Sequence, residues 1–288
     1  MDRAEVFSQY RPLLFSIAYR MLGIVMDAED MVQETFMRWQ SSPGAIESPK
    51  AYLSTVITRM CIDHLRSARV QREEYIGPWL PEPTVTETPH ASAVLADSLS
   101  IAFLHVLESL SPVERAVFLL REVFDYGYGE IAHMVGKSEA NCRQMVKRAK
   151  ERIAERRPRF DVRREEHERL LAEFSQACLT GDVNGLLSLF ADDITLYSDG
   201  GGKAGTARNP IYTPAKVARF IFAILRRAPP GFSARIAQVN GQPAIISYAD
   251  GAPYAILAFD IGDGRIRSIY NIINPDKLTR VPPTESAS

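Results

Sequence analysis

Residues 139–153 gather arginine, lysine, glutamine and asparagine on one side of a predicted helix. In the major groove of DNA, arginine can pair with guanine, and glutamine or asparagine with adenine, while lysine contacts phosphate. At about 100° per residue, the apolar side chains occupy an arc of roughly 100°. That arc contains Met145, Ala149, Cys142, Ile153 and Val146. The remaining surface, which we predict to read DNA, carries Asn141, Arg143, Gln144, Lys147 and Arg148.

A shorter helix and a glycine turn precede this helix. Ile131, Ala132 and Val135 have the spacing of a core-facing helical stripe. Gly136 can adopt the left-handed conformation that ends a helix, and Ser138 can cap the next one. The pattern predicts a helix-turn-helix. The alternative is an amphipathic surface helix whose charges are solvated.

The overall charge does not indicate a nucleic-acid binder, because the formal net charge is only -1. The distribution of charge is more informative. Between Arg143 and Arg164 there are ten lysines or arginines against three acids. Such a local basic stripe can attract a polyanion, although a charge run can also be simply solvated.

The composition gives no sign of a metal, a cofactor or a membrane segment. Cys61, Cys142 and Cys178 are isolated, without CxxC or zinc-type spacing, and are expected to be small core residues in a reducing compartment. No apolar run approaches the roughly 20 residues of a membrane span. The N-terminus lacks a signal-peptide layout, so we expect a cytoplasmic protein.

Residues 1–76 are predicted to be entirely helical. One helix has an apolar stripe of Val32, Phe36 and Trp39. Another face of the same helix carries Asp27, Asp30 and Glu34, at spacings of three and four. This acidic face could dock a basic partner, or it could be solvated.

A second helix should begin at Ser48 and Pro49, a good cap and first turn. One side of it carries Tyr52, Thr55, Arg59, Asp63 and Arg66, and Arg69 extends that side. Exposed aromatic and basic groups on one face suit unstacked bases of a nucleic acid. A solvated face is the competing interpretation.

Residues 77–97 are predicted to be a linker, because four prolines forbid a continuous helix. The apolar segment Trp79–Pro83 within it is expected to pack against other residues. Residues 98–164 are predicted to be helical again. Ser111, Pro112 and Glu114 form the pattern of a capping box at one helix start.

From residue 165 the sequence predicts an α+β domain that extends to residue 281, followed by a disordered tail at 282–288. Helices are expected at 165–180, 183–190 and 214–227, and a strand at 194–198. The dipeptides Asn240-Gly241, Asp250-Gly251 and Asp263-Gly264 are strong hairpin signals. Three such turns imply a four-stranded antiparallel meander, and helices packed on a curved, wholly antiparallel sheet are expected to form a cone.

In combination, these motifs resemble the extracytoplasmic-function (ECF) sigma factors, multi-domain proteins with two all-α sigma domains. Residues 27–39 resemble region 2.2, which docks on the polymerase beta-prime clamp helices, and the resemblance implies docking by Asp27, Asp30, Gln33, Glu34, Phe36 and Arg38. Residues 51–69 resemble regions 2.3 and 2.4, which implies −10 contacts by Tyr52, Arg59, Asp63, His64, Arg66 and Arg69. Residues 110–153 resemble region 4, which touches the beta flap and implies −35 contacts by Ser138, Asn141, Arg143, Gln144, Lys147 and Arg148. The chain departs from many relatives at Met145, where they carry a basic residue.

Three further motifs resemble the SigJ-like subgroup, which fuses a SnoaL-like cone to the sigma core and generally lacks a separate anti-sigma factor. They are Trp79-Leu80-Pro81-Glu82-Pro83, Asp199-Gly200-Gly201-Gly202-Lys203 and Asn274-Pro275-Asp276-Lys277-Leu278. The resemblance implies a sigma factor that needs core RNA polymerase and promoter DNA, with no cofactor. The cone would regulate it by contacts of these motifs near the linker.

Two alternatives stay open. The cone could bind a small ligand or retain isomerase- or cyclase-type catalysis, with Asp193, Asp199, Tyr197 and Tyr212 as candidate groups and His167 as its only histidine. However, Asp199 followed by three glycines is more typical of a turn or ligand loop than of a buried base. The second alternative is a stand-alone DNA-binding repressor, which would have no use for a polymerase-docking face.

Overall fold

A computed structural model describes residues 2–43, 46–73, 75–85, 99–155 and 164–284 of the chain; within its helices the side chains of residues 68–73 and 155 are outside the description. The chain divides into two compact units. The helical unit comprises residues 1–74 and 106–156, and the cone unit comprises residues 75–105 and 157–288. The segment predicted as a linker therefore belongs, where it is described, to the cone unit. Most of its length, residues 86–98, is outside the described residues, as are residues 285–288 of the predicted tail.

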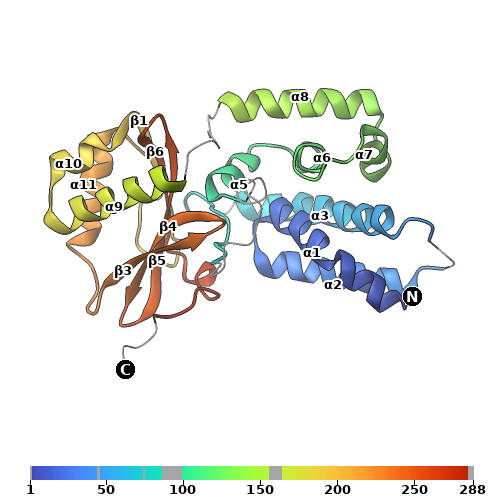
Figure 1. Cartoon of the computed structure of the whole chain (residues 1–288), viewed down its shortest axis with the longest axis horizontal. Coiled ribbons are helices and arrows are strands. Elements are labelled where there is room, and N and C mark those ends of the chain that lie inside the picture. The colour runs from blue at the N-terminus through green and yellow to red at the C-terminus, as the bar shows by residue number, and fades with distance from the viewer. Residues whose placement is uncertain (1, 44–45, 74, 86–98, 156–163, 285–288) are drawn as a thin grey trace. The chain divides into compact units, whose positions relative to one another are not determined.

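The helical unit is built from amphipathic helices that bury their apolar stripes against one another (Figure 1). These are α1 (Arg3–Leu22), α2 (Val25–Ser41), α3 (Pro49–Glu73), α6 (Pro112–Glu122), α7 (Tyr128–Val135) and α8 (Glu139–Glu155). Leu14, Ile17, Leu53 and Ile57 are almost completely buried. Gly23, with φ of 72°, ends α1. The all-helical prediction for the N-terminal part is confirmed.

The predicted helix ends are also confirmed. Ser111 and Glu114 form a reciprocal capping box at the start of α6. Gly136 ends α7 with φ of 65°, a conformation that costs glycine little because it has no Cβ. The hydroxyl of Ser138 accepts a hydrogen bond from the Asn141 amide at 3.3 Å, at the start of α8. The helix-turn-helix thus follows from local sequence chemistry.

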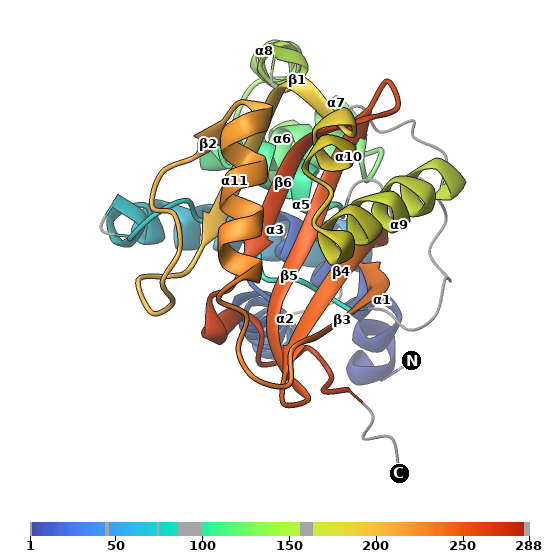
Figure 2. The same cartoon turned by 90° about the vertical axis from the view of Figure 1, so that its left-hand side faces the viewer.

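The cone unit packs helices on one face of a six-stranded sheet, as Figure 2 shows for α9, α10 and α11. Its helices are α9 (Arg164–Thr180), α10 (Val183–Ser188) and α11 (Pro214–Leu225), and a short helix, α5 (Ile101–Leu107), runs across the boundary between the units. The strand order is β2-β1-β6-β5-β4-β3. The strands are β1 (Phe190–Asp199), β2 (Ile211–Tyr212), β3 (Ser233–Val239), β4 (Gln242–Ala249), β5 (Ala252–Gly262) and β6 (Arg265–Ile272).

The predicted meander is confirmed, and each of its turns uses the expected dipeptide. Both residues of each pair have positive φ, as in Asn240 at 53° and Gly241 at 76°, which matches the twist of a hairpin. The expectation of a wholly antiparallel sheet is wrong, because β1 pairs with β6 in parallel. No hairpin joins these two strands. The chain reaches β6 only after α11 and strands β3, β4 and β5. A connection of that length permits parallel pairing.

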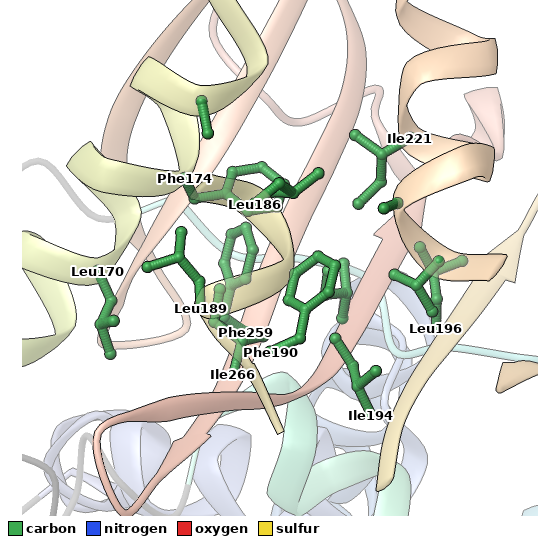
Figure 3. Close-up of a cluster of buried hydrophobic side chains, with 14 of the residues drawn as sticks. Leu170, Phe174, Leu186, Leu189, Phe190, Ile194, Leu196, Ile221, Phe259 and Ile266 are labelled. Carbon is green, nitrogen blue, oxygen red and sulfur yellow. The ribbon is translucent and has the colours of Figure 1, made fainter. Parts of the chain in front are cut away.

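Each face of the sheet carries its own core. On the helix-covered face, Phe174, Ile221 and Phe259 belong to a large apolar cluster (Figure 3). On the opposite face, Leu80 packs with Ile256 and Ile272 among other apolar residues. The α+β cone fold is thereby confirmed, and the apolar linker segment packs on it. Among the described residues, none of the helices has the length and apolar character needed to cross a lipid bilayer.

Candidate functional site

Helix α8 presents the predicted DNA-reading side chains on its exposed side. Cys142, Val146 and Ala149 are buried, as the helical projection requires, and Met145 is half-buried at the edge of that arc. The predicted readers are exposed except for the half-buried Asn141: Ser138, Arg143, Gln144, Lys147 and Arg148. This geometry leaves guanidinium, amide and ammonium groups available to base edges and phosphates.

Tyr128, at the start of α7, is an additional member of this surface. The Arg143 guanidinium lies 4.8 Å from the centre of the Tyr128 ring, and that of Arg121 lies 5.2 Å from it. Arg143 also donates to Glu139 at 2.9 Å. These contacts hold the Arg143 side chain in one direction. Sequence reasoning missed Tyr128, because no periodicity links it to a residue fifteen positions later.

The predicted −10 side chains occupy one face of α3. Tyr52, Arg59, Asp63 and Arg66 fall within an arc of about 60° at 100° per residue. The structure places His64 elsewhere, half-buried and 3.3 Å from the carboxylate of Asp27 on α2. The side chain of Arg69 is outside the described residues.

Arg59 is already engaged within the helical unit. Its guanidinium donates to the carbonyl oxygens of Met134 at 2.8 Å and His133 at 2.9 Å, at the end of α7. The hydroxyls of Ser54 and Tyr126 form a buried hydrogen bond of 2.7 Å nearby. The helix-turn-helix therefore rests on the same helix that carries the −10 residues.

The buried Arg115 of α6 joins α6 to the end of α1. The Arg115 guanidinium donates to the carbonyl of Met21 at 2.6 Å and pairs with Glu108 at 2.7 Å. Arg20, also buried, lies over the Phe124 ring at 5.5 Å. Burial lowers the pKa of Arg20 to about 10, so the group still carries its charge at neutral pH.

The predicted polymerase-docking residues lie on α2, and half of them are exposed. Asp30, Gln33 and Arg38 are exposed, whereas Asp27, Glu34 and Phe36 are half-buried. Phe36 packs on α1, with its ring 4.8 Å from that of Phe7. The same surface also exposes two methionines that sequence reasoning missed, Met26 at 62% and Met37 at 60%. Two exposed methionines on one helix face are a feature of adaptable protein interfaces.

In the cone unit, the three subgroup motifs meet around one buried carboxylate. Asp199, at the end of β1, is fully buried. One of its oxygens accepts from Tyr75 at 2.5 Å and from the Gly201 amide at 3.0 Å. The other accepts from the Leu80 amide at 2.9 Å and from Lys277 at 2.7 Å. We call Asp199 and its four partners, Tyr75, Leu80, Gly201 and Lys277, the linker clamp. Tyr75 lies just before the start of the predicted linker and Leu80 lies just after it.

The clamp corrects one interpretation made from the sequence. The glycines after Asp199 form the predicted turn, but Asp199 itself is a buried ion-pair partner whose lone pairs are occupied. Lys277 also donates to the carbonyl of Leu80, and its ammonium lies 4.3 Å from the centre of the Trp79 ring. Burial and the hydrogen bond to Asp199 hold the pKa of Tyr75 well above its usual range, so the phenol remains a donor.

The other motif residues surround the clamp. Asn274 donates to the Tyr75 hydroxyl at 3.0 Å, and Lys203 pairs with Asp276 at 2.5 Å. Glu82 is buried and lies 3.7 Å from Arg280. The buried Pro81, Pro83 and Leu278 complete the packing around these polar groups, while Pro275 starts the short turn Pro275–Lys277 that carries Lys277.

Each of the three glycines after Asp199 faces a different neighbour. A Cβ on Gly200 would lie 2.5 Å from the Ala204 carbonyl oxygen. On Gly201 it would lie 2.3 Å from the Asn274 amide, and on Gly202 it would lie 2.9 Å from Ile76. The glycine run therefore serves close packing of the loop within the cone unit, and Gly201 and Gly202 also have positive φ.

We expect Gly201→Ala to destabilise the cone unit by about 2–3 kcal/mol, because it combines a left-handed backbone with displacement of the Asn274 amide. Urea unfolding measures this. Gly205→Ala is the matched control, since a Cβ there meets nothing within 4 Å and φ is not positive. Equal stability of the two variants would contradict the proposed close packing.

The candidate catalytic groups of the cone do not come together in a cavity. Asp193 and Tyr212 are exposed, and Tyr197 stacks on Tyr270, with ring centres 5.5 Å apart. His167 is buried on α9, and this burial lowers its pKa to about 4. No group of three or more potential metal-binding side chains is found in the part of the chain that the structure describes.

Comparison with known proteins agrees with this organisation. Residues 6–70 match the family model "Sigma-70 region 2", and residues 100–153 match "Sigma-70, region 4". The chain is 37% identical to the ECF RNA polymerase sigma factor SigJ of Mycobacterium tuberculosis, over 97% of this chain and 94% of that protein. It is 33% identical to the probable ECF sigma factor SigI of the same species, over 93% and 92% of the two chains. The crystal structure of M. tuberculosis SigJ matches with a TM-score of 0.78 at 35% identity, covering 96% of this chain and 98% of that one.

Proposed function

This chain belongs to the ECF RNA polymerase sigma factors and directs promoter-specific transcription initiation, and we propose that α8 reads the −35 element while α3 engages the −10 strand. The observation that carries the assignment of residues is the exposed basic and amide face of α8, the second helix of the helix-turn-helix. Core RNA polymerase supplies the catalytic site, so we assign no catalytic residue, metal or cofactor to this chain. We place this activity in the cytoplasm, where promoter DNA and the polymerase are found.

We propose that the described packing of the helical unit is a closed state. Arg59, a proposed −10 contact, donates to two carbonyls at the end of α7. It can contact the −10 strand only after these hydrogen bonds break. Binding to core polymerase and promoter would then have to separate the helix-turn-helix from α3.

We propose that the cone controls this sigma factor through the linker clamp. The linker joins the −10 and −35 readers in sequence, and its first residues are tied to Asp199 and Lys277. Holding or releasing these residues changes the length of chain that is available between the two readers. A cone that holds the start of the linker in this way would be a regulator within the same chain, and we propose that no separate anti-sigma factor is needed.

A test of the function is run-off transcription with the full chain, core RNA polymerase and a pooled promoter library. We expect promoter-selective transcripts, and Asp199→Ala should change their yield or the preferred spacing between promoter elements. A deletion of the cone is less suitable, because it would expose Leu80 and the other linker residues that pack on the sheet. Absence of transcripts from a folded full chain that also fails to bind core polymerase would reject the proposal.

For the docking surface, we expect Met37→Ser to weaken binding to core polymerase about tenfold, since burying a methionine contributes about 1.5–3 kcal/mol. Binding is measured with purified core polymerase by biolayer interferometry. The matched control is Leu179→Ser on α9, because Leu179 is 83% exposed but lies in the cone unit. Equal affinities of both variants would place the interface elsewhere.

A catalytic role of the cone is not part of this proposal. The cone cavity lined by Phe174 and Ile221 has no aspartate, glutamate or histidine among its described lining residues. An isomerase or cyclase of the kind considered from the sequence needs such a base beside its substrate.

A further inference from the structure

The cone unit contains a cavity on the helix-covered side of its sheet. Its volume is about 880 Å³, within the usual range of small-molecule sites. Phe174 and Ile221 form part of its wall, and Figure 3 shows both at the apolar cluster between helices and sheet. Such a wall favours an apolar ligand.

The mouth of the cavity is apolar as well. Three lining residues expose large apolar side chains to solvent: Leu179 at 83%, Ile236 at 42% and Phe232 at 36%. When a ligand covers exposed apolar groups around a concave site, apolar surface is removed from water and binding becomes more favourable.

The charged groups of the lining have one sign. Arg227 and the backbone of Arg235 border the cavity, and no acidic residue lines it among the residues that the structure describes. The Arg235 side chain, however, points to the other face of the sheet, where it is paired with Ile246 and its Nε donates to the Tyr248 hydroxyl at 3.0 Å. A single guanidinium group, that of Arg227, beside an apolar cavity without acidic side chains complements an anionic head group on an apolar chain.

A polar chain links the lining to the linker clamp. Asn271 donates to Ser198 at 2.7 Å, and the Ser198 and Thr206 hydroxyls lie 2.5 Å apart. Asn271 and Thr206 line the cavity. Ser198 directly precedes Asp199 in β1, so the two side chains point to opposite faces of the sheet. A displacement of Ser198 therefore acts on the residue that holds Tyr75 and Leu80.

We infer that this cavity binds an amphiphilic monoanion of the fatty-acid class, and that its occupancy alters the linker clamp through the Asn271–Ser198–Asp199 path. The inference that the cavity binds a ligand depends only on the residues that line it. The inference that the ligand regulates the chain rests on the proposed sigma function. The ligand is held by its apolar chain and by charge, without a chemical step.

The binding test uses three probes with the same ten-carbon chain: decanoate, decanol and decyltrimethylammonium, all below their micellar concentrations. Calorimetric titration of the full chain should show decanoate binding at least tenfold tighter than decanol, and no saturable binding of the cation. Arg227→Gln, a change at an exposed position, should lower decanoate affinity about tenfold. Equal affinity for the three probes, or no effect of Arg227→Gln, would overturn the inference.

Two further measurements locate the site and its effect. Ala223→Trp, which fills the cavity from α11, should abolish decanoate binding, and unchanged binding would overturn the location. Hydrogen exchange of the Leu80 amide, which is bonded to Asp199, should change on addition of decanoate, and an unchanged rate at saturation would overturn the coupling. Neither readout needs transcription, so loss of promoter-specific transcripts with intact decanoate binding would reject only the sigma function.

Discussion

Lys277→Met should lower the free energy of unfolding of the cone unit by about 3–5 kcal/mol, because it leaves a buried carboxylate without its positive partner. The Asp199 side chain is fully buried and that of Lys277 is 7% exposed. The neutral donors Tyr75, Leu80 and Gly201 remain, but they do not balance the charge. The measurement is urea denaturation followed by hydrogen exchange of the β4–β6 amides, which reports the cone unit separately.

Lys203→Met is the matched control. Lys203 pairs with Asp276 at 2.5 Å, but both side chains are more than half exposed. Surface pairs contribute about 0–1 kcal/mol, so this variant should remain close to the wild-type stability. The double variant Asp199→Asn with Lys277→Met should recover part of the loss, because the unpaired charge is removed. An equal, small effect of the two single lysine variants would show that the clamp charge does not stabilise the cone.

Arg148→Ala should reduce discrimination at one base pair of the −35 element by about 1–3 kcal/mol, or roughly five- to 150-fold, if the guanidinium reads a guanine edge. Arg148 is exposed on α8 and lies on the same polar side as Gln144. The measurement is promoter selection from a library randomised at the −35 element, with full chain and core polymerase. Arg143→Ala should give a similar loss at a different position.

Lys147→Ala distinguishes base reading from charge alone. Its side chain is 78% exposed, and its ammonium group is expected to contact phosphate and not a base. This variant should weaken binding about equally on all sequences and lower the salt dependence of log K by about one unit of slope. Loss of sequence preference in Lys147→Ala, or unchanged preference in both arginine variants, would contradict the assigned roles on α8.

In the closed packing of the helical unit, α7 occupies a side chain that is proposed to contact the −10 strand. Because Arg59 both bonds to α7 and faces the proposed −10 strand, Arg59→Ala cannot separate the two roles. Tyr126→Phe removes only the buried hydrogen bond to Ser54. It is therefore the better variant for asking whether opening of this packing limits initiation.

Local chemistry in the sequence determined most of the secondary structure. Ser111 and Glu114 form their capping box, and Gly136 adopts the left-handed conformation, through contacts within a few residues. The hairpin dipeptides act in the same way, because positive φ at both positions closes a hairpin irrespective of the rest of the fold. The exposed face of α8 also follows from helical periodicity alone.

Contacts between distant residues were decided only by the tertiary structure. Lys277 reaches Asp199 across 78 positions, and Tyr75 reaches it across 124, so no periodicity could connect them. The parallel pairing of β1 with β6 has the same origin, as do the engagement of Arg59 by α7 and the placement of Arg227 at the cone cavity. Short-range steric and capping preferences are encoded within a turn of chain. Ion pairs, cavities and strand order depend on which surfaces bury one another, and that is settled when the whole unit packs.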